Sequence, residues 1–233
     1  MYFIDEDREL LKKTPDRCRP SFSSGENALY IPLDCYADLL KKYLLKTDLK
    51  KDFENTRYII MHFDESVRDV CHKTAPHAII CVLPYTVDNF IISSIVKYCR
   101  FLEEKYSDQP DSEQYLLIHE HWKLLLSRLN GQNLPRWTTY RGEIVNLLWL
   151  RSRIFEFYPV TEQLYYAKST FESLCREPYF RTSAEYCMED MINTLFNCTS
   201  HDISELPLTM ENWEDEILNG IAFQQFEDGY NRL

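Results

Sequence analysis

The chain has 233 residues, with 26 basic and 37 acidic side chains and a formal net charge of −11 at pH 7. Its hydrophobic share of 45% is enough to build a core, which excludes an intrinsically disordered chain. A surface with this excess of negative charge repels phosphate groups, so we expect neither a nucleic-acid partner nor a membrane partner.

The eight cysteines are spread along the chain and do not form the cluster that is typical of a small disulfide framework. We therefore expect reduced thiols and a cytoplasmic or nuclear location. The most apolar stretch, Ala78 to Val96, is interrupted by Pro84 and Asp88, so we expect no membrane span.

The first third of the chain shows strand signals. Residues 1–20 form a charged arm, and residues 21–33 predict two short strands joined by a turn at Ser24 to Asn27. Asp34 is placed to cap a helix. Further strands are predicted at 57–63 and at 78–83, where an apolar run ends at Pro84.

The rest of the chain shows helical periodicity. Helices are predicted to begin near Thr86, near Asp111, at Thr138 or Thr139, at Pro159 and at Ser183, with a last helix at about 210–223. In the third of these, Ile144, Leu147, Leu148 and Phe155 are expected to face inward. The fold class is therefore α+β, mostly helical, with a small sheet from the N-terminal third.

Four segments resemble the S-phase kinase-associated protein family, the F-box-binding adaptors of Skp–cullin–F-box ubiquitin ligases. They are Ser23 to Glu26 with Tyr30-Ile31-Pro32; Leu83 to Val87 with Ile95 to Cys99; Leu147 to Pro159; and Glu189 to Asn197 with His201 to Ser204 and Glu211 to Glu214. The resemblance implies a BTB/POZ-like N-terminal part with added C-terminal helices. It implies an arm at 1–20, a BTB/POZ-like domain at 21–158 with an insertion at about 46–77, a partner-binding helical module at 159–216 and a tail at 217–233.

The function implied by the resemblance is that of a non-enzymatic adaptor within a ubiquitin-ligase complex, with an F-box-like protein as partner. The implied partner-binding residues share an apolar character and lie in the C-terminal module: Met191, Ile192, Leu195, Phe196, Ile203 and Trp213. A helix-in-groove contact needs apolar anchors at this helical spacing. The alternative is that the stripe is ordinary core and that Trp213 is a strap over the protein's own surface.

A cullin is a further candidate partner. The family's Ala-Ala-Asn-Tyr segment, which meets the cullin, corresponds to Arg151-Ser152-Arg153-Ile154. Arg153 and Ile154 therefore mark the cullin-side surface that the resemblance implies, and the replacement of Asn and Tyr there leaves open whether a cullin binds.

No nucleophile elbow, phosphate loop or dinucleotide motif is present in the sequence, so we expect no enzyme and no cofactor. Cys71, His72, His77 and Cys81 are the one metal-like cluster, but their spacing is irregular and buried thiols are the simpler interpretation, so no metal is expected. Two alternatives remain open: a structural subunit of a multiprotein assembly of kinetochore, chromatin or scaffold type that lacks cullin binding, and an enzyme with an unrecognised active site.

Overall fold

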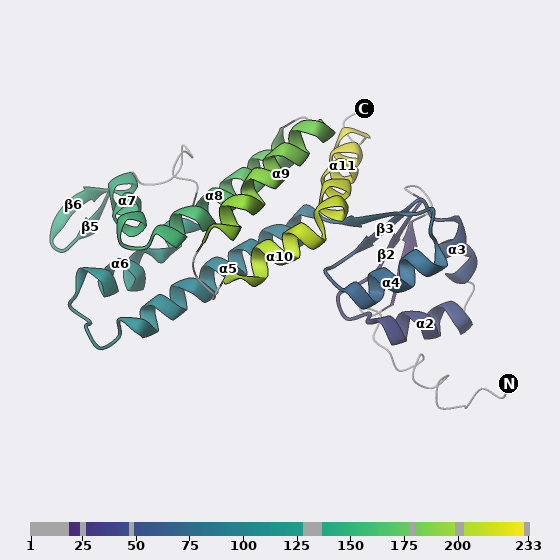
Figure 1. Cartoon of the computed structure of the whole chain (residues 1–233), viewed down its shortest axis with the longest axis horizontal. Helices are drawn as coiled ribbons and strands as arrows, with labels where there is room; N and C mark the ends of the chain where they lie inside the picture. Colours follow the sequence, from purple (N-terminus) through teal and green to yellow (C-terminus); the bar gives the residue numbers. More distant parts are fainter. Residues whose placement is uncertain are drawn as a thin grey trace. The chain divides into compact units, whose positions relative to one another are not determined.

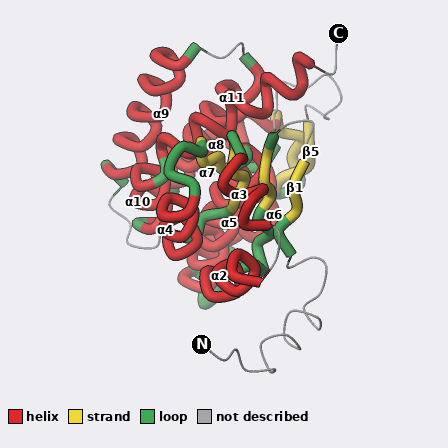
Figure 2. Tube along the Cα trace, turned by 90° about the vertical axis from the view of Figure 1, so that its right-hand side faces the viewer, coloured by secondary structure: helices red, strands yellow, loops and turns green. Residues whose placement is uncertain are grey.

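The computed structural model describes residues 19–23, 27–46, 49–127, 137–177, 180–198 and 203–230. Most of these residues are helical (red in Figure 2), and the strands form one four-stranded sheet and one hairpin. The expected α+β class with a predominance of helix is confirmed. Among the described residues, no helix is long and apolar enough to cross a membrane.

The chain divides into two compact units. Unit 1 comprises residues 1–87 and 213–233, and unit 2 comprises residues 88–212. The sequence had predicted boundaries after residues 20, 158 and 216. The division differs because the C-terminal helix returns to the N-terminal sheet, a long-range contact that no local pattern announces.

Unit 1 is built on a sheet of strand order β1-β2-β3-β4. Strand β1 (Ser21–Ser23) pairs antiparallel with β2 (Ala28–Tyr30), and β2, β3 (Tyr58–Met61) and β4 (Ile79–Val82) run parallel. All three predicted strand regions are confirmed. The turn predicted at Ser24 to Asn27 falls largely outside the described residues.

The parallel strands are joined by helices α2 (Ala37–Lys46), α3 (Leu49–Asn55) and α4 (Glu65–Thr74), which lie together beside the sheet (Figure 1). Parallel strands need such crossovers, and right-handed connections place the helices on one side. Alternation along the strands sends Leu29, Ile59 and Ile80 to one face and Tyr30, Ile60 and Cys81 to the other. We call the second surface the Tyr30 face; it comprises Ala28, Tyr30, Tyr58, Ile60, Cys81 and Leu83.

Helix α11 (Glu214–Tyr230) packs against β4, the edge strand of the sheet. Its Asn219 side chain donates a hydrogen bond to the Ile80 carbonyl at 3.1 Å, which satisfies an acceptor at the strand edge. Phe223 of the same helix joins the buried cluster of Ala28, Ile60 and Cys81 on the Tyr30 face. Ile217, Leu218, Ile221 and Phe223, which the sequence assigned to a tail, are therefore buried side chains of unit 1.

Unit 2 is almost wholly helical. It contains most of α5 (Pro84–Lys105), followed by α6 (Glu113–His121), the short 3-10 helix η2 (Trp122–Leu125), the hairpin of β5 (Trp137–Tyr140) and β6 (Glu143–Asn146), and the helices α7 (Leu147–Phe157), α8 (Pro159–Arg176), α9 (Arg181–Phe196) and α10 (Glu205–Asn212). Helices α8 and α9 pack on each other, and α10 packs on α9.

The helix predicted from Thr138 or Thr139 is wrong at its start. Residues 137–146 form a hairpin, and the helix begins only at Leu147. The turn is made by Arg141 and Gly142, both with positive φ (51° and 83°), which is the geometry that two-residue hairpins require. Ile144, expected to face inward, is 76% exposed in consequence, and Leu148 is also exposed.

Candidate functional site

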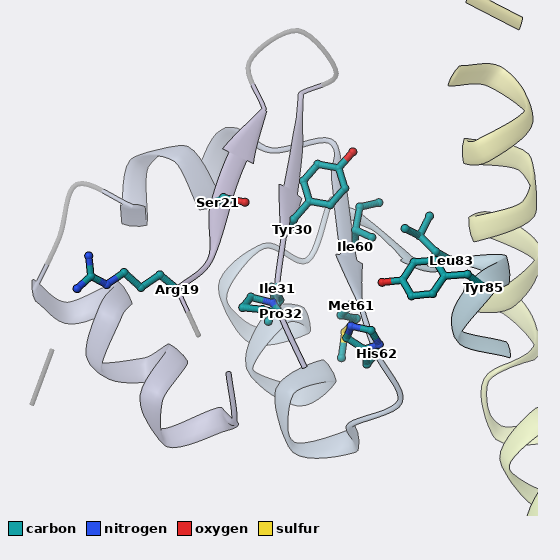
Figure 3. A pocket seen from close by; sticks show the side chains of 10 residues that line it. All are labelled: Arg19, Ser21, Tyr30, Ile31, Pro32, Ile60, Met61, His62, Leu83 and Tyr85. Atoms are coloured by element: carbon teal, nitrogen blue, oxygen red, sulfur yellow. The ribbon is translucent and has the colours of Figure 1, made fainter. Parts of the chain in front are cut away.

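A pocket of about 280 Å³ lies in unit 1, where the parallel strands end. Figure 3 shows Tyr30, Ile60, Leu83 and Tyr85 on one side of it, His62 at the end of β3, and Arg19 extending from the segment before β1. We call it the Tyr85 pocket, and it is lined by Arg19, Ser21, Tyr30, Ile31, Pro32, Ile60, Met61, His62, Leu83 and Tyr85.

Local sequence rules explain why these side chains meet. Tyr30 and Ile60 are paired residues of neighbouring parallel strands, so they share one face of the sheet. His62 and Leu83 each follow the last residue of a strand, and Tyr85 lies in the first turn of α5. Crevices at the carboxyl ends of parallel strands are the usual place for ligand sites in such sheets.

The polar character of the pocket differs from that of the whole chain. Its ten lining residues include Arg19 and His62 but no aspartate or glutamate. The His62 Nδ1 atom and the Thr86 hydroxyl oxygen are 3.2 Å apart, and the Tyr85 ring meets the His62 ring edge to face at a centroid distance of 6.0 Å. In a chain of net charge −11, the part of the lining that the structure describes carries no negative side chain.

Burial lowers the pKa of His62 below its ordinary value of 6.5, because the partly enclosed ring loses hydration in its charged form. The unfolded chain takes up a proton near pH 6.5, whereas the folded chain does so only at lower pH. The unfolded state therefore binds more protons in mild acid, and stability decreases as the pH falls through 6.5.

We expect the midpoint of urea unfolding to decrease between pH 7.5 and pH 5.5. His62→Gln should remove part of this decrease, because it removes the ring whose charged form burial disfavours. An equal pH dependence in His62→Gln and in the parent chain would contradict the assignment.

A second polar cluster lies beyond the end of β3, within unit 1. The Arg68 guanidinium sits 4.1 Å above the Trp213 ring, its Nη1 lies 3.4 Å from Glu216 Oε1, and Phe63 meets the same indole edge to face. The Asp64 carboxylate accepts a hydrogen bond from the Val67 amide at 2.9 Å and caps α4. This cluster fastens α11 to α4, so we assign it a structural role.

The structure places the six residues predicted to bind a partner mostly in the interior. Met191, Ile192, Leu195 and Ile203 are at most 4% exposed in unit 2, and Trp213 is 2% exposed in unit 1. Phe196 is the exception, with 41% of its surface exposed. Burial within the fold accounts for the apolar character of the other five residues.

The two residues of the expected cullin-side surface are also held within the fold. Ile154 is fully buried, and the Arg153 guanidinium reaches Glu113 of α6 at 2.8 Å and also pairs with Glu156. Arg153 therefore links α6 to α7 within unit 2.

The pocket residues themselves were not singled out from the sequence. Tyr30, Leu83 and Tyr85 were noted only as parts of a resemblance, and His62 was not noted at all. The signal that could have found them is positional, because each lies at or just beyond the carboxyl end of a parallel strand.

Comparison with known proteins decides the family. A family model for transposases, of the ISL3 type within the DDE class, matches residues 24–230 of the 233. The chain belongs to this transposase family. No curated protein and no solved structure gives a significant match.

This membership corrects several expectations. The resemblance to the S-phase kinase-associated protein family is wrong, and with it the adaptor function, the ubiquitin-ligase complex, and the F-box-like and cullin partners. The BTB/POZ-like description rested on that resemblance and loses its basis. The alternative of a structural subunit and that of an enzyme of unrecognised type do not match the family either.

The expectations of no enzyme and no nucleic acid are also wrong for a transposase, because transposition cuts and joins DNA. The charge argument failed because net charge is a sum over the whole surface. DNA is met by a local patch, whose charge can differ from that of the whole chain.

Metal-dependent cleavage of a phosphodiester needs side-chain ligands that converge on the metal ions. Across the described ranges, no group of three or more His, Cys, Asp and Glu side chains is placed to hold a metal ion. Two carboxylates near the end of β3 have partners within unit 1: Asp64 caps α4, and Glu216 faces Arg68. The described residues do not fit a metal centre, and we assign no metal-dependent step to them.

Likewise, the metal-like quartet of the sequence does not converge. Cys71 and Cys81 are buried in unit 1, and burial raises the pKa of each thiol to about 12. His72 and His77 are exposed. Thiols with so high a pKa stay protonated, so neither cysteine is a ready metal ligand at neutral pH.

Proposed function

We propose that the protein acts in DNA transposition and that the end of the unit 1 sheet, with the Tyr85 pocket, contacts the DNA. The observation that carries the proposal is the transposase match over residues 24–230, which spans both units. We further propose that it works in the compartment that holds the genome, whether cytoplasm or nucleus.

The pocket supports this proposal through its lining. Phosphate groups are favoured beside cations and disfavoured beside carboxylates, and the described lining of the pocket includes Arg19 and no aspartate or glutamate. Tyr30 and Tyr85 add aromatic rings at the same place. Basic and aromatic side chains together are the usual composition of a surface for nucleic acid.

We expect the full chain to bind fluorescently labelled DNA in an anisotropy titration, with an affinity that decreases as salt rises. Each phosphate contact releases counterions, so a surface with few cations should show a shallow salt slope, of about one to three contacts. Unrelated DNA of the same length serves as the control for sequence preference. Absence of binding to every DNA tested at about 50 mM salt would overturn the proposed function.

A further inference from the structure

We propose that the β5–β6 hairpin of unit 2 docks into the major groove of duplex DNA, with Arg141 of its turn against the phosphate backbone. This inference rests on the proposed function, because it takes DNA as the partner of the chain. It goes beyond that function by adding a second surface for DNA, outside the Tyr85 pocket.

One face of the hairpin is open to solvent. Residues directly opposite each other in an antiparallel pair share a face, and so do residues two apart along a strand. The β5–β6 register therefore places Trp137, Thr139 and Ile144 together on one surface, which we call the hairpin face. Trp137 is 59% exposed, Ile144 is 76% exposed, and Thr139 is exposed as well. Large apolar side chains that stay together in solvent indicate a contact surface.

The opposite face fastens the hairpin to unit 2. Tyr140 is 5% exposed, and its ring centroid lies 5.6 Å from that of His121 and 6.3 Å from that of Trp149. Glu143 is the residue paired with Tyr140, so its carboxylate belongs to this side of the ribbon. The hairpin face, as its described residues define it, carries no carboxylate in a chain of net charge −11. Figure 1 shows the ribbon projecting beside α7.

The turn of the hairpin carries an arginine where its backbone favours other residues. Arg141 has a φ of 51° and precedes Gly142, whose φ is 83°. Turns of this kind favour Asn-Gly or Asp-Gly, because most side chains crowd the backbone at positive φ. What arginine adds there is an exposed guanidinium, and within the described part of the chain no carboxylate forms an ion pair with it.

The size and charge of the ribbon suit duplex DNA. Each strand has four residues, which span about 13 Å at about 3.3 Å per residue. The major groove is about 12 Å wide and admits a two-stranded ribbon. Thr139 and Ile144 can then contact thymine methyl groups, while Arg141 contacts a phosphate. A second copy of the chain would bring another Arg141 and no acid on its own hairpin face, whereas DNA brings the opposite charge.

The test titrates a labelled duplex with the full chain and with the Arg141→Asn variant. Asparagine suits positive φ, so the turn is kept while the charge is removed. We expect the affinity to fall on the order of tenfold at about 50 mM salt and the salt slope to fall by about one, because one phosphate contact is lost.

Arg100→Gln is the matched control. Arg100 is also exposed in unit 2, on α5, and its replacement changes the net charge by the same amount. This variant should bind the duplex as the parent chain does, since a loss that came from net charge alone would appear equally in both variants.

Trp137→Ala tests the hairpin face itself. It should weaken duplex binding several-fold while the unfolding midpoint stays close to that of the parent chain, because the removed side chain is largely exposed. A single strand of the same length should bind less tightly than the duplex, since it offers no groove.

Three results would overturn this inference and leave the proposed function in place. They are an Arg141→Asn variant that binds as Arg100→Gln does, a single strand that binds more tightly than the duplex, and a dimer in sedimentation that Trp137→Ala dissociates without any loss of duplex affinity. Failure to bind any DNA would overturn the proposed function and this inference with it.

Discussion

Gly220→Ala is expected to lower the free energy of unfolding by about 2 kcal/mol, although alanine normally stabilises a helix interior by about 1 kcal/mol relative to glycine. Gly220 lies in α11, where the helix backbone crosses the backbone of β4. A Cβ atom there would lie 2.6 Å from the Val82 carbonyl carbon and closer still to its oxygen. The clashing atoms belong to the Val82 backbone, which cannot rotate away as a side chain could. The helix must therefore move off the strand.

The measurement is urea unfolding, combined with hydrogen exchange of the β4 amides, which should become less protected in the variant. Gln224→Ala, at an exposed position one turn further along α11, controls for helix propensity and should be neutral or slightly stabilising. If Gly220→Ala proves as stable as the parent chain, α11 does not lie against β4 in the way described.

Trp213→Ala is expected to cost about 4 kcal/mol, the usual range for emptying a large buried aromatic site. The indole is 2% exposed, packs edge to face on Phe63 and lies beneath the Arg68 guanidinium. Its loss leaves a cavity between α4 and the start of α11, and it leaves Arg68 without its aromatic partner. Thermal unfolding should therefore begin at a clearly lower temperature than in the parent chain.

The matched control is Trp137→Ala, since Trp137 is 59% exposed on the β5–β6 hairpin and its removal should change stability by less than about 0.5 kcal/mol. Trp213→Phe should recover part of the loss. If Trp213→Ala were as mild as Trp137→Ala, residue 213 would be a surface anchor and not part of the core.

The sheet of unit 1 could be predicted because its signals are local. The apolar run at 78–83, ended by Pro84, is β4, and the run at 57–63 is β3. The helix start at Pro159 was also correct, since proline at the first helical turn acts within a few residues. The helix predicted to begin at Ser183 begins at Arg181, after Phe180 and without a side-chain cap, so Ser183 lies inside its first turn.

The elements that failed depend on distant or competing signals. The hairpin at 137–146 was missed because its apolar residues also fit a helical period. The turn at Arg141-Gly142, with positive φ at both residues, is the feature that favours a hairpin over a helix there. The docking of α11 on β4 joins Asn219 to Ile80 across 139 residues, which no sequence window contains. The Tyr85 pocket likewise depends on the pairing of β2, β3 and β4, which lie far apart in the sequence.

The error about function has a related origin. The apolar pattern that includes Met191, Leu195 and Trp213 fits a surface that binds a partner, but it fits a buried core equally well. The structure shows these three side chains buried. Short motifs in the right order along the chain therefore supported the wrong family, and the transposase match over residues 24–230 corrects that assignment.

The most direct test of the central claim is the titration of labelled DNA with the full chain as salt is raised from about 50 mM to about 200 mM. For a transposase-family protein that meets DNA at the Tyr85 pocket, we expect saturable binding that weakens with salt and that Arg19→Ala reduces. A chain of net charge −11 with no DNA function would show no binding at any salt, and that result would contradict the account.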